Sequence, residues 1–188
     1  MDITFIRHGH AEHLLDYPNQ LNWLHPGLTE LGKSQVTALR KQVMLEPKDV
    51  ILVSPTKRTI ETALLLTARE NLMICPLVGP RMFPQNPEFV PLVCDQIYSK
   101  DELHAQFAGI RLVDLGLNCW DEGINRMEEH RFEVYAEQLL QWCREQDGNT
   151  VIISHDGTIT NYRILLGEKG LTRRDFLGEA GMYTIRNF

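Results

Sequence analysis

Residues 2–9 read Asp-Ile-Thr-Phe-Ile-Arg-His-Gly. The stretch 2–6 has the length and the apolar character of a short buried strand, and this strand ends where the Arg-His-Gly begins. Three later stretches, 50–53, 72–75 and 150–153, are short apolar runs of the same kind. We predict that each of them is a strand, with a last strand over 182–185.

Helical patterns separate these runs. Thr29 is a suitable N-cap for a helix with Leu28, Leu31 and Leu39 on one face, which should stop at Pro47. Further helices are predicted from Pro55 to about Ala68 and over a segment whose apolar face runs from Phe132 to Cys143 and which ends before Gly148. A last helix should follow the Ser-His-Asp-Gly-Thr of 154–158 and continue to about Leu166. Alternating strands and helices predict an α/β fold, a three-layer sandwich whose mostly parallel central sheet is covered by helices on both faces.

The 188 residues suit a single domain, 1–188. Between 79 and 127 the pattern breaks down into proline- and glycine-rich loops, with one helix expected near 100–107. Long loops of this kind in a compact domain often act as lids or binding loops. We therefore expect this region to set substrate specificity.

Composition excludes several functional classes. The net charge is −6 and the Lys and Arg residues are scattered, so neither a nucleic acid nor a membrane surface is an expected partner. No apolar run approaches the roughly 20 residues that span a bilayer, and the N-terminus has no signal-peptide pattern. The four cysteines form no C-x-x-C pair and are expected to be reduced. A cytoplasmic protein is expected, and the sequence does not indicate its oligomeric state.

Three of the predicted strands are followed by basic or imidazole side chains. Arg7 and His8 follow the first strand, Arg58 comes shortly after the second, and His155 follows the strand over 150–153. Ligands of parallel sheets bind beyond the carboxyl ends of the strands. We expect these four side chains to meet in one site.

Two other motifs compete for the same part of the chain. Gly27 to Ser34 satisfies the phosphate-loop pattern G-x-x-x-x-G-K-[ST], but the segment reads as helix where that motif needs a loop. His8-Gly-His10-Ala-Glu12-His13 resembles the H-x-H-x-D-H element of zinc hydrolases of the metallo-β-lactamase type. A permanent positive charge on Arg7 disfavours a divalent cation at that place, so no metal site is predicted.

Four motifs, taken in order, resemble the histidine phosphatase superfamily, which contains cofactor-dependent phosphoglycerate mutases and many small phosphatases. The resemblance covers most of residues 1–70 and 148–167. The motifs are Arg7-His8-Gly9, Leu28-Thr29-x-x-Gly32-x-x-Gln35, Ser54-Pro55-x-x-Arg58-x-x-x-Thr62-Ala63 and Ser154-His155.

This resemblance implies a phosphatase that forms a phosphohistidine on His8, without metal or cofactor, and acts on a small-molecule phosphate ester. The side chains of the four motifs are chemically suited to this reaction. Arg7 and Arg58 could each bond two phosphate oxygens, a neutral imidazole can attack phosphorus, and His155 could stabilise the transition state. We predict that His8 is held in one tautomer by a hydrogen bond from its other ring nitrogen. The alternatives are a mutase-type phosphotransferase, a zinc-dependent hydrolase and a non-catalytic phospho-ligand binder.

The general acid is not evident from the sequence. Where the family often has a Glu-Arg pair, this chain has Pro80-Arg81. A carboxyl group with a raised pKa is the usual proton donor to a leaving alkoxide, and the candidates are Asp156, Glu88 and Asp95, of which Asp156 is slightly favoured. The alternative is that the chain has no strong acid and acts only on good leaving groups, such as aryl phosphates or phosphohistidine. Two glycines, Gly9 and Gly157, are also predicted to contact the substrate.

Overall fold

The computed structural model describes residues 1–67, 72–86 and 88–188, and within these residues six strands form one sheet. The order across the sheet is β4-β3-β2-β5-β1-β6. Neighbouring strands are parallel except for β6, which pairs antiparallel with β1. The strands are β1 (Ile3–Arg7), β2 (Val50–Val53), β3 (Met73–Ile74), β4 (Arg111–Leu112), β5 (Thr150–Ser154) and β6 (Met182–Ile185).

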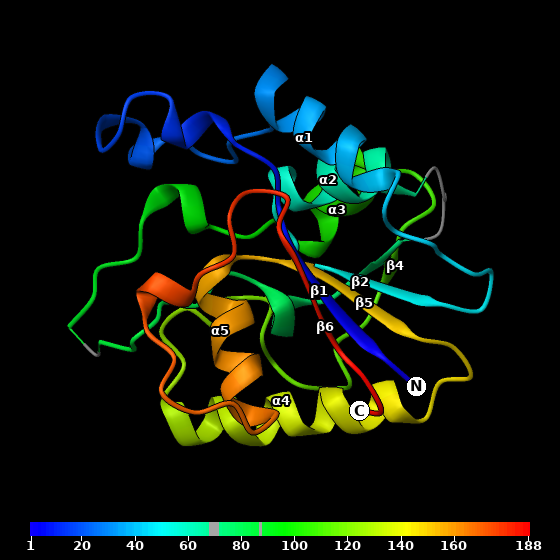
Figure 1. The fold of residues 1–188 in the computed structure, drawn as a ribbon. Helices are drawn as coiled ribbons and strands as arrows, with labels where there is room; N and C mark the ends of the chain where they lie inside the picture. The colour runs from blue at the N-terminus through cyan, green and yellow to red at the C-terminus, as the bar shows by residue number, and fades with distance from the viewer. Residues whose placement is uncertain (68–71, 87) are drawn as a thin grey trace.

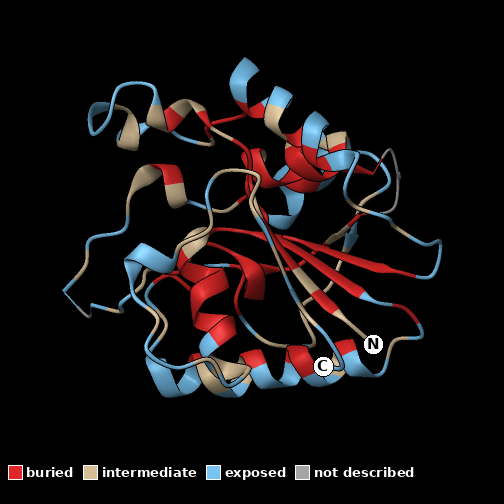
Figure 2. Cartoon of the chain, in the orientation of Figure 1, coloured by how far each residue is buried: buried red, intermediate tan, exposed pale blue. Residues whose placement is uncertain are grey.

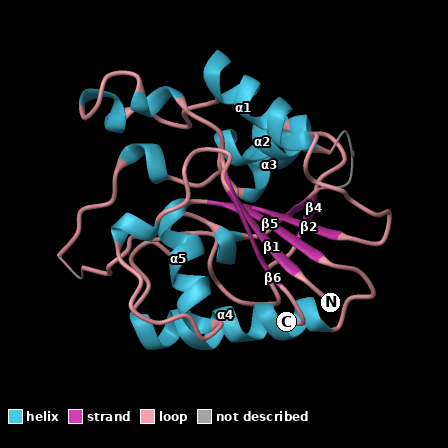
Figure 3. Ribbon diagram, in the orientation of Figure 1, coloured by secondary structure: helices cyan, strands magenta, loops and turns pink. Residues whose placement is uncertain are grey.

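Helices cover both faces of the sheet (Figures 1 and 3). Three helices lie over one face: α1 (Glu30–Arg40), α2 (Lys57–Leu66) and α3 (Lys100–Gln106). Two lie over the other: α4 (Glu129–Arg144) and α5 (Asp156–Leu165). The predicted three-layer α/β fold is confirmed.

The central strands are buried on both faces because their alternate side chains enter two separate hydrophobic cores (Figure 2). In β2, Leu52 packs in the core under α4, whereas Ile51 and Val53 pack in the core under α1 and α2. The same alternation separates Ile152 from Ile153 in β5. This arrangement explains why these strands read as unbroken apolar runs rather than as alternating sequences.

Two predicted helix boundaries were wrong. Helix α1 ends at Arg40, well before Pro47, and Leu31 is 57% exposed because its position points away from the face that carries Val36 and Leu39. Helix α2 begins after Pro55, at Lys57, with Thr56 as its N-cap. The predicted end of this helix near Ala68 lies outside the described residues.

In the irregular region 79–127 the expected helix is present as α3. Strand β4 and a short 3₁₀ helix, η4 (Val93–Asp95), were not predicted, since two or three residues are too few to show a period. The last predicted strand is β6. No helix in the described part of the chain is both long and apolar enough to cross a membrane.

Candidate active site

His8 follows β1 and is buried, with an exposed fraction of 3%. Its Nδ1 atom donates a hydrogen bond of 2.7 Å to the carbonyl oxygen of Gly9, because a carbonyl can only accept. The Nε2 atom therefore carries a lone pair, as the predicted tautomer requires. Burial lowers the pKa of His8 well below its usual value, and the charges of Arg58 and Arg7 lower it further. His8 is thus neutral, with an unprotonated Nε2 atom.

Arg58, in the first turn of α2, connects the two imidazoles of the site and is almost completely buried. Its Nε atom donates to His8 Nε2 at 3.3 Å, and its Nη2 atom donates to His155 Nδ1 at 3.3 Å. The rings of His8 and His155 lie 5.3 Å apart between centroids. The structure therefore brings together three residues that are widely separated in the sequence.

His155 is the N-cap residue of α5 and is also buried. Because Nδ1 accepts from Arg58, the Nε2 atom carries the proton and donates to Ser54 Oγ at 2.8 Å. Burial, followed by the charge of Arg58, lowers the pKa of His155 well below its usual value. The imidazole of His155 is therefore neutral as well.

Arg7, at the end of β1, lines a pocket together with His8, Arg58 and His155. Its Nη1 atom donates to the Leu177 carbonyl at 2.7 Å, and its Nη2 atom is 3.1 Å from Asp156 Oδ2. The other carboxylate oxygen of Asp156 accepts from the backbone N–H of Gly157 at 2.6 Å. These are the contacts of a carboxylate, so Asp156 is placed as a partner of Arg7.

The two predicted glycines differ in position. Gly157 lines the pocket, and a Cβ there would overlap the backbone oxygen of Arg81. Gly9 is not among the residues that line the pocket in the described chain; its carbonyl holds His8, and its N–H donates to Thr62 Oγ1 at 3.3 Å. Gly32 faces this loop, where a Cβ would overlap the His10 carbonyl.

His13 is a site residue that the sequence did not single out for phosphate chemistry. It is buried, it lines the pocket, and its ring centroid is 6.0 Å from that of His8. Burial, with the charges of Arg58 and Arg7, lowers the pKa of His13 to about 3. Its Nδ1 atom and the Nε atom of Arg7 are buried without a hydrogen-bond partner in the described part of the chain. The sequence feature that could have identified His13 is the His-rich run over 8–13, which resembles a zinc-binding motif.

The zinc-like motif is divided in space: His8 and His13 line the pocket, whereas His10 and Glu12 do not. His10 Nδ1 is hydrogen-bonded to Thr29 Oγ1 at 2.9 Å, and Glu12 accepts from the N–H of Gly27 at 2.7 Å. Among the residues with described positions, no three His, Cys, Asp or Glu side chains form a group that could hold a metal ion. The phosphate-loop segment is helical from Glu30 onward, and the Gly32 N–H bonds to Thr29 Oγ1.

The three acid candidates occupy different surroundings. Asp95 lies in the pocket, where its Oδ1 atom accepts from Arg58 Nη2 at 3.0 Å and burial raises its pKa against the lowering effect of Arg58. Glu88 is exposed and does not line the pocket. Arg81, from the unusual Pro80-Arg81 pair, donates to the carbonyls of Ile124 and Met127 and has a structural role.

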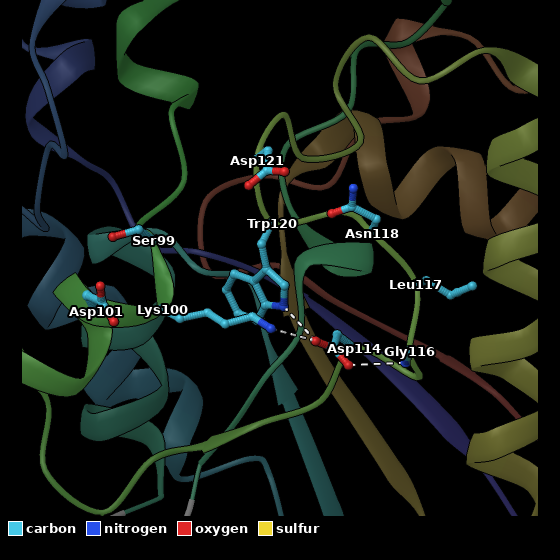
Figure 4. A pocket seen from close by; sticks show the side chains of 9 residues that line it. All are labelled: Ser99, Lys100, Asp101, Asp114, Gly116, Leu117, Asn118, Trp120 and Asp121. Atoms are coloured by element: carbon cyan, nitrogen blue, oxygen red, sulfur yellow. Dashed lines mark hydrogen bonds and ion pairs between the residues drawn. The ribbon is translucent and has the colours of Figure 1, made fainter.

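The active-site pocket has a volume of about 450 Å³. Its inner half is formed by the side chains described above that line it: Arg7, His8, His13, Arg58, Asp95 and His155. A second pocket, of about 540 Å³, lies beside α3 (Figure 4). There Asp114 accepts from Lys100 at 2.9 Å and from the Trp120 indole at 3.0 Å. With Asp101 and Asp121 also lining it, carboxylates outnumber its one cation, which disfavours a phosphate dianion.

Solved structures share this fold. A phosphoserine phosphatase mutant from Entamoeba histolytica, solved with phosphoserine, has 18% identity and a TM-score of 0.60, with 97% of this chain and 89% of that chain covered. The ecdysone phosphate phosphatase of Bombix mori, solved with tungstate, has 17% identity and a TM-score of 0.62, covering 98% and 88%. A phosphoglycerate mutase from Thermus thermophilus has 16% identity and a TM-score of 0.56, covering 99% and 93%. At such identities the likeness establishes the fold class.

The family comparison is more specific. Residues 3–77 match the model of the histidine phosphatase superfamily (branch 1), which confirms the resemblance predicted from the motifs. The matched stretch includes Arg7, His8 and Arg58, whereas His155 lies beyond it. No curated protein sequence matches the chain closely enough to count as a relative.

Proposed function

We propose that this chain is a phosphatase that hydrolyses phosphate monoesters through a phosphohistidine on His8. The observation that carries the proposal is the unprotonated Nε2 atom of a buried, neutral His8, whose lone pair accepts a hydrogen bond of 3.3 Å from the guanidinium of Arg58. A phosphate dianion needs positive charge and several hydrogen-bond donors. Arg7 and Arg58 line the pocket next to this nitrogen and supply both. The neutral His155 lines the same pocket, and its N–H would have to leave Ser54 before it could donate to the phosphate.

The reaction has two displacement steps. In the first, His8 Nε2 forms a bond to phosphorus while the ester P–O bond breaks, and the leaving oxygen takes the electron pair and a proton from a carboxyl group. In the second, a water oxygen attacks phosphorus and returns a proton to that carboxylate, and the N–P electron pair goes back to Nε2. Arg7 and Arg58 stabilise the charge on the transferred group in both steps.

Asp95 is our choice for the proton donor. Its carboxyl group is desolvated, which raises its pKa, whereas Asp156 is one-third exposed and is held by Arg7 and the Gly157 N–H. An arriving phosphate dianion would compete for Arg58 and add negative charge beside Asp95. Both effects favour the protonated acid.

The proposal is tested by trapping the intermediate. Enzyme mixed with an ester labelled in its phosphoryl group and quenched within one turnover should carry an alkali-stable, acid-labile label. The label should be absent from His8→Ala and present in His130→Ala, since the His130 side chain is 82% exposed. A labelled His8→Ala protein would refute the nucleophile.

The same assay tests independence from metal. Turnover should continue in excess chelator, because the steps above use only the ester, water and side chains of the pocket. Loss of turnover in chelator, restored by added zinc, would refute this part of the proposal and favour the zinc hydrolase alternative.

A further inference from the structure

The outer half of the active-site pocket is lined mainly by apolar side chains. They come from segments around the carboxyl ends of the strands: 12–22, 82–86 with 88–92, and 173–177 (Figure 1). Aromatic rings are prominent among them, and the rings of Phe83 and Phe176 lie 6.2 Å apart between centroids. The apolar side chains of this outer lining are Leu14, Leu21, Met82, Phe83, Phe89, Leu92 and Phe176.

These seven side chains do not serve the hydrophobic cores. None of them belongs to either core cluster, or to the partly buried groups packed against those clusters, within the described chain. All seven are intermediate in burial rather than fully enclosed or fully exposed. Since they also line the pocket, part of their apolar surface faces its interior.

Polar groups in the outer half are few. Asn86, Asn125 and Arg173 line it, and the guanidinium of Arg173 lies 5.8 Å from the centre of the Phe176 ring. The Asn125 side chain is already engaged, donating to Asp95 and accepting from the N–H of Met82. A leaving group rich in hydroxyls or charges would find few partners here, whereas an apolar group would be removed from water.

We propose that the substrate is a phosphate monoester of an apolar alcohol or phenol, whose hydrocarbon part binds the outer lining. This inference rests on the proposed function, because the inner half must take the phosphate. The phosphoryl group would lie against His8 and Arg58, and the alkyl or aryl group would extend toward Leu14, Leu21 and Phe89.

A homologous series of n-alkyl phosphates, from methyl to octyl, tests the proposal. The leaving alcohols beyond ethyl have nearly equal acidity, so the chemical step is constant and only burial changes. We expect kcat/KM to rise about fourfold for each methylene that becomes buried, until the pocket is filled. Glycerol phosphate and phosphoserine should be turned over more slowly than pentyl phosphate.

Paired variants locate the effect. Leu21→Ser and Phe89→Ser should each flatten the dependence of kcat/KM on chain length. The matched controls Leu24→Ser and Val90→Ser should keep it, because Leu24 and Val90 are 56% and 76% exposed and do not line the pocket. Two separate segments are tested, so a folding defect in one variant does not decide the outcome.

The outcomes separate the two proposals. If polar and alkyl esters react equally fast, the apolar-substrate inference is refuted and the phosphatase proposal stands. If no phosphate ester in the series is hydrolysed and no phosphohistidine forms, the proposed function itself is refuted.

Discussion

The two halves of the active-site pocket are built from different kinds of structure. In the inner half, His8 and His155 directly follow β1 and β5, and Arg58 lies in the first turn of α2; all three are buried. The outer half comes from loops and short 3₁₀ helices whose apolar side chains are only partly buried. Regular elements hold reacting groups more precisely than loops do. Under the two proposals, the inner half would carry out the chemistry and the outer half would select the substrate.

The largest effect should follow a change in the inner half. Arg58→Lys keeps the charge but removes the planar fork that contacts both imidazoles, so kcat/KM should fall about a thousandfold. Arg131→Lys, at an exposed position, is the matched control and should retain its activity. A loss of less than tenfold for Arg58→Lys would mean that the fork does not organise the transition state.

The next effect concerns the proton donor. Asp95→Asn should lower kcat for alkyl phosphates about a hundredfold, because their alkoxides need a proton, and for aryl phosphates only a few-fold. Asp156→Asn is the comparison and should affect both classes alike. The reverse result, with leaving-group sensitivity at Asp156 alone, would make Asp156 the acid.

A third effect appears in stability. The pKa of His13 falls to about 3 on folding, mainly through burial, so below the usual histidine pKa the unfolded chain binds a proton that the folded chain does not. His13 therefore makes stability fall as pH drops from about 6.5 toward 3, by about 1.4 kcal/mol, or tenfold in the unfolding equilibrium, per pH unit. His13→Gln should make this dependence shallower by that amount in denaturant unfolding measured at several pH values. Parallel curves for the two proteins would contradict it.

The smallest effect belongs to the outer half. Leu14→Ala removes apolar surface that, under the proposal, contacts the substrate equally in the ground and transition states. KM for hexyl phosphate should therefore rise about fivefold while kcat is unchanged. Leu15→Ala is the neighbouring control, since Leu15 is 62% exposed and lies outside the pocket lining. A fall in kcat for Leu14→Ala would show that the two halves are not separate in function.

The inner half could be predicted from the sequence because its signals are local. Each of Arg7, His8, Arg58 and His155 lies close to a short apolar run that had to be a buried strand. Parallel strands bring their carboxyl ends together, so the convergence followed from the order of the elements.

The remaining parts depend on contacts between distant segments. Asp95 reaches the pocket because η4 lies against the end of the Arg58 side chain, whose Nη1 atom donates to the Cys94 carbonyl at 2.7 Å. No sequence period reports such a contact. The apolar lining of the outer half could not be predicted from the sequence either. Half-buried leucines and phenylalanines in irregular segments cannot be distinguished from core residues by sequence alone.

The close approach of Gly32 to the backbone of His10 gives α1 an unexpected influence. No side chain of this helix lines the pocket, but the turn after β1 packs directly on its surface. A Cβ added at Gly9 would lie 2.7 Å from the Gly32 carbonyl oxygen. Any side chain at Gly32 would lift that turn and displace the His8 imidazole with it. A substitution at Gly32 in α1 would thus abolish turnover by displacing the proposed nucleophile, His8, while every side chain of the pocket is still present.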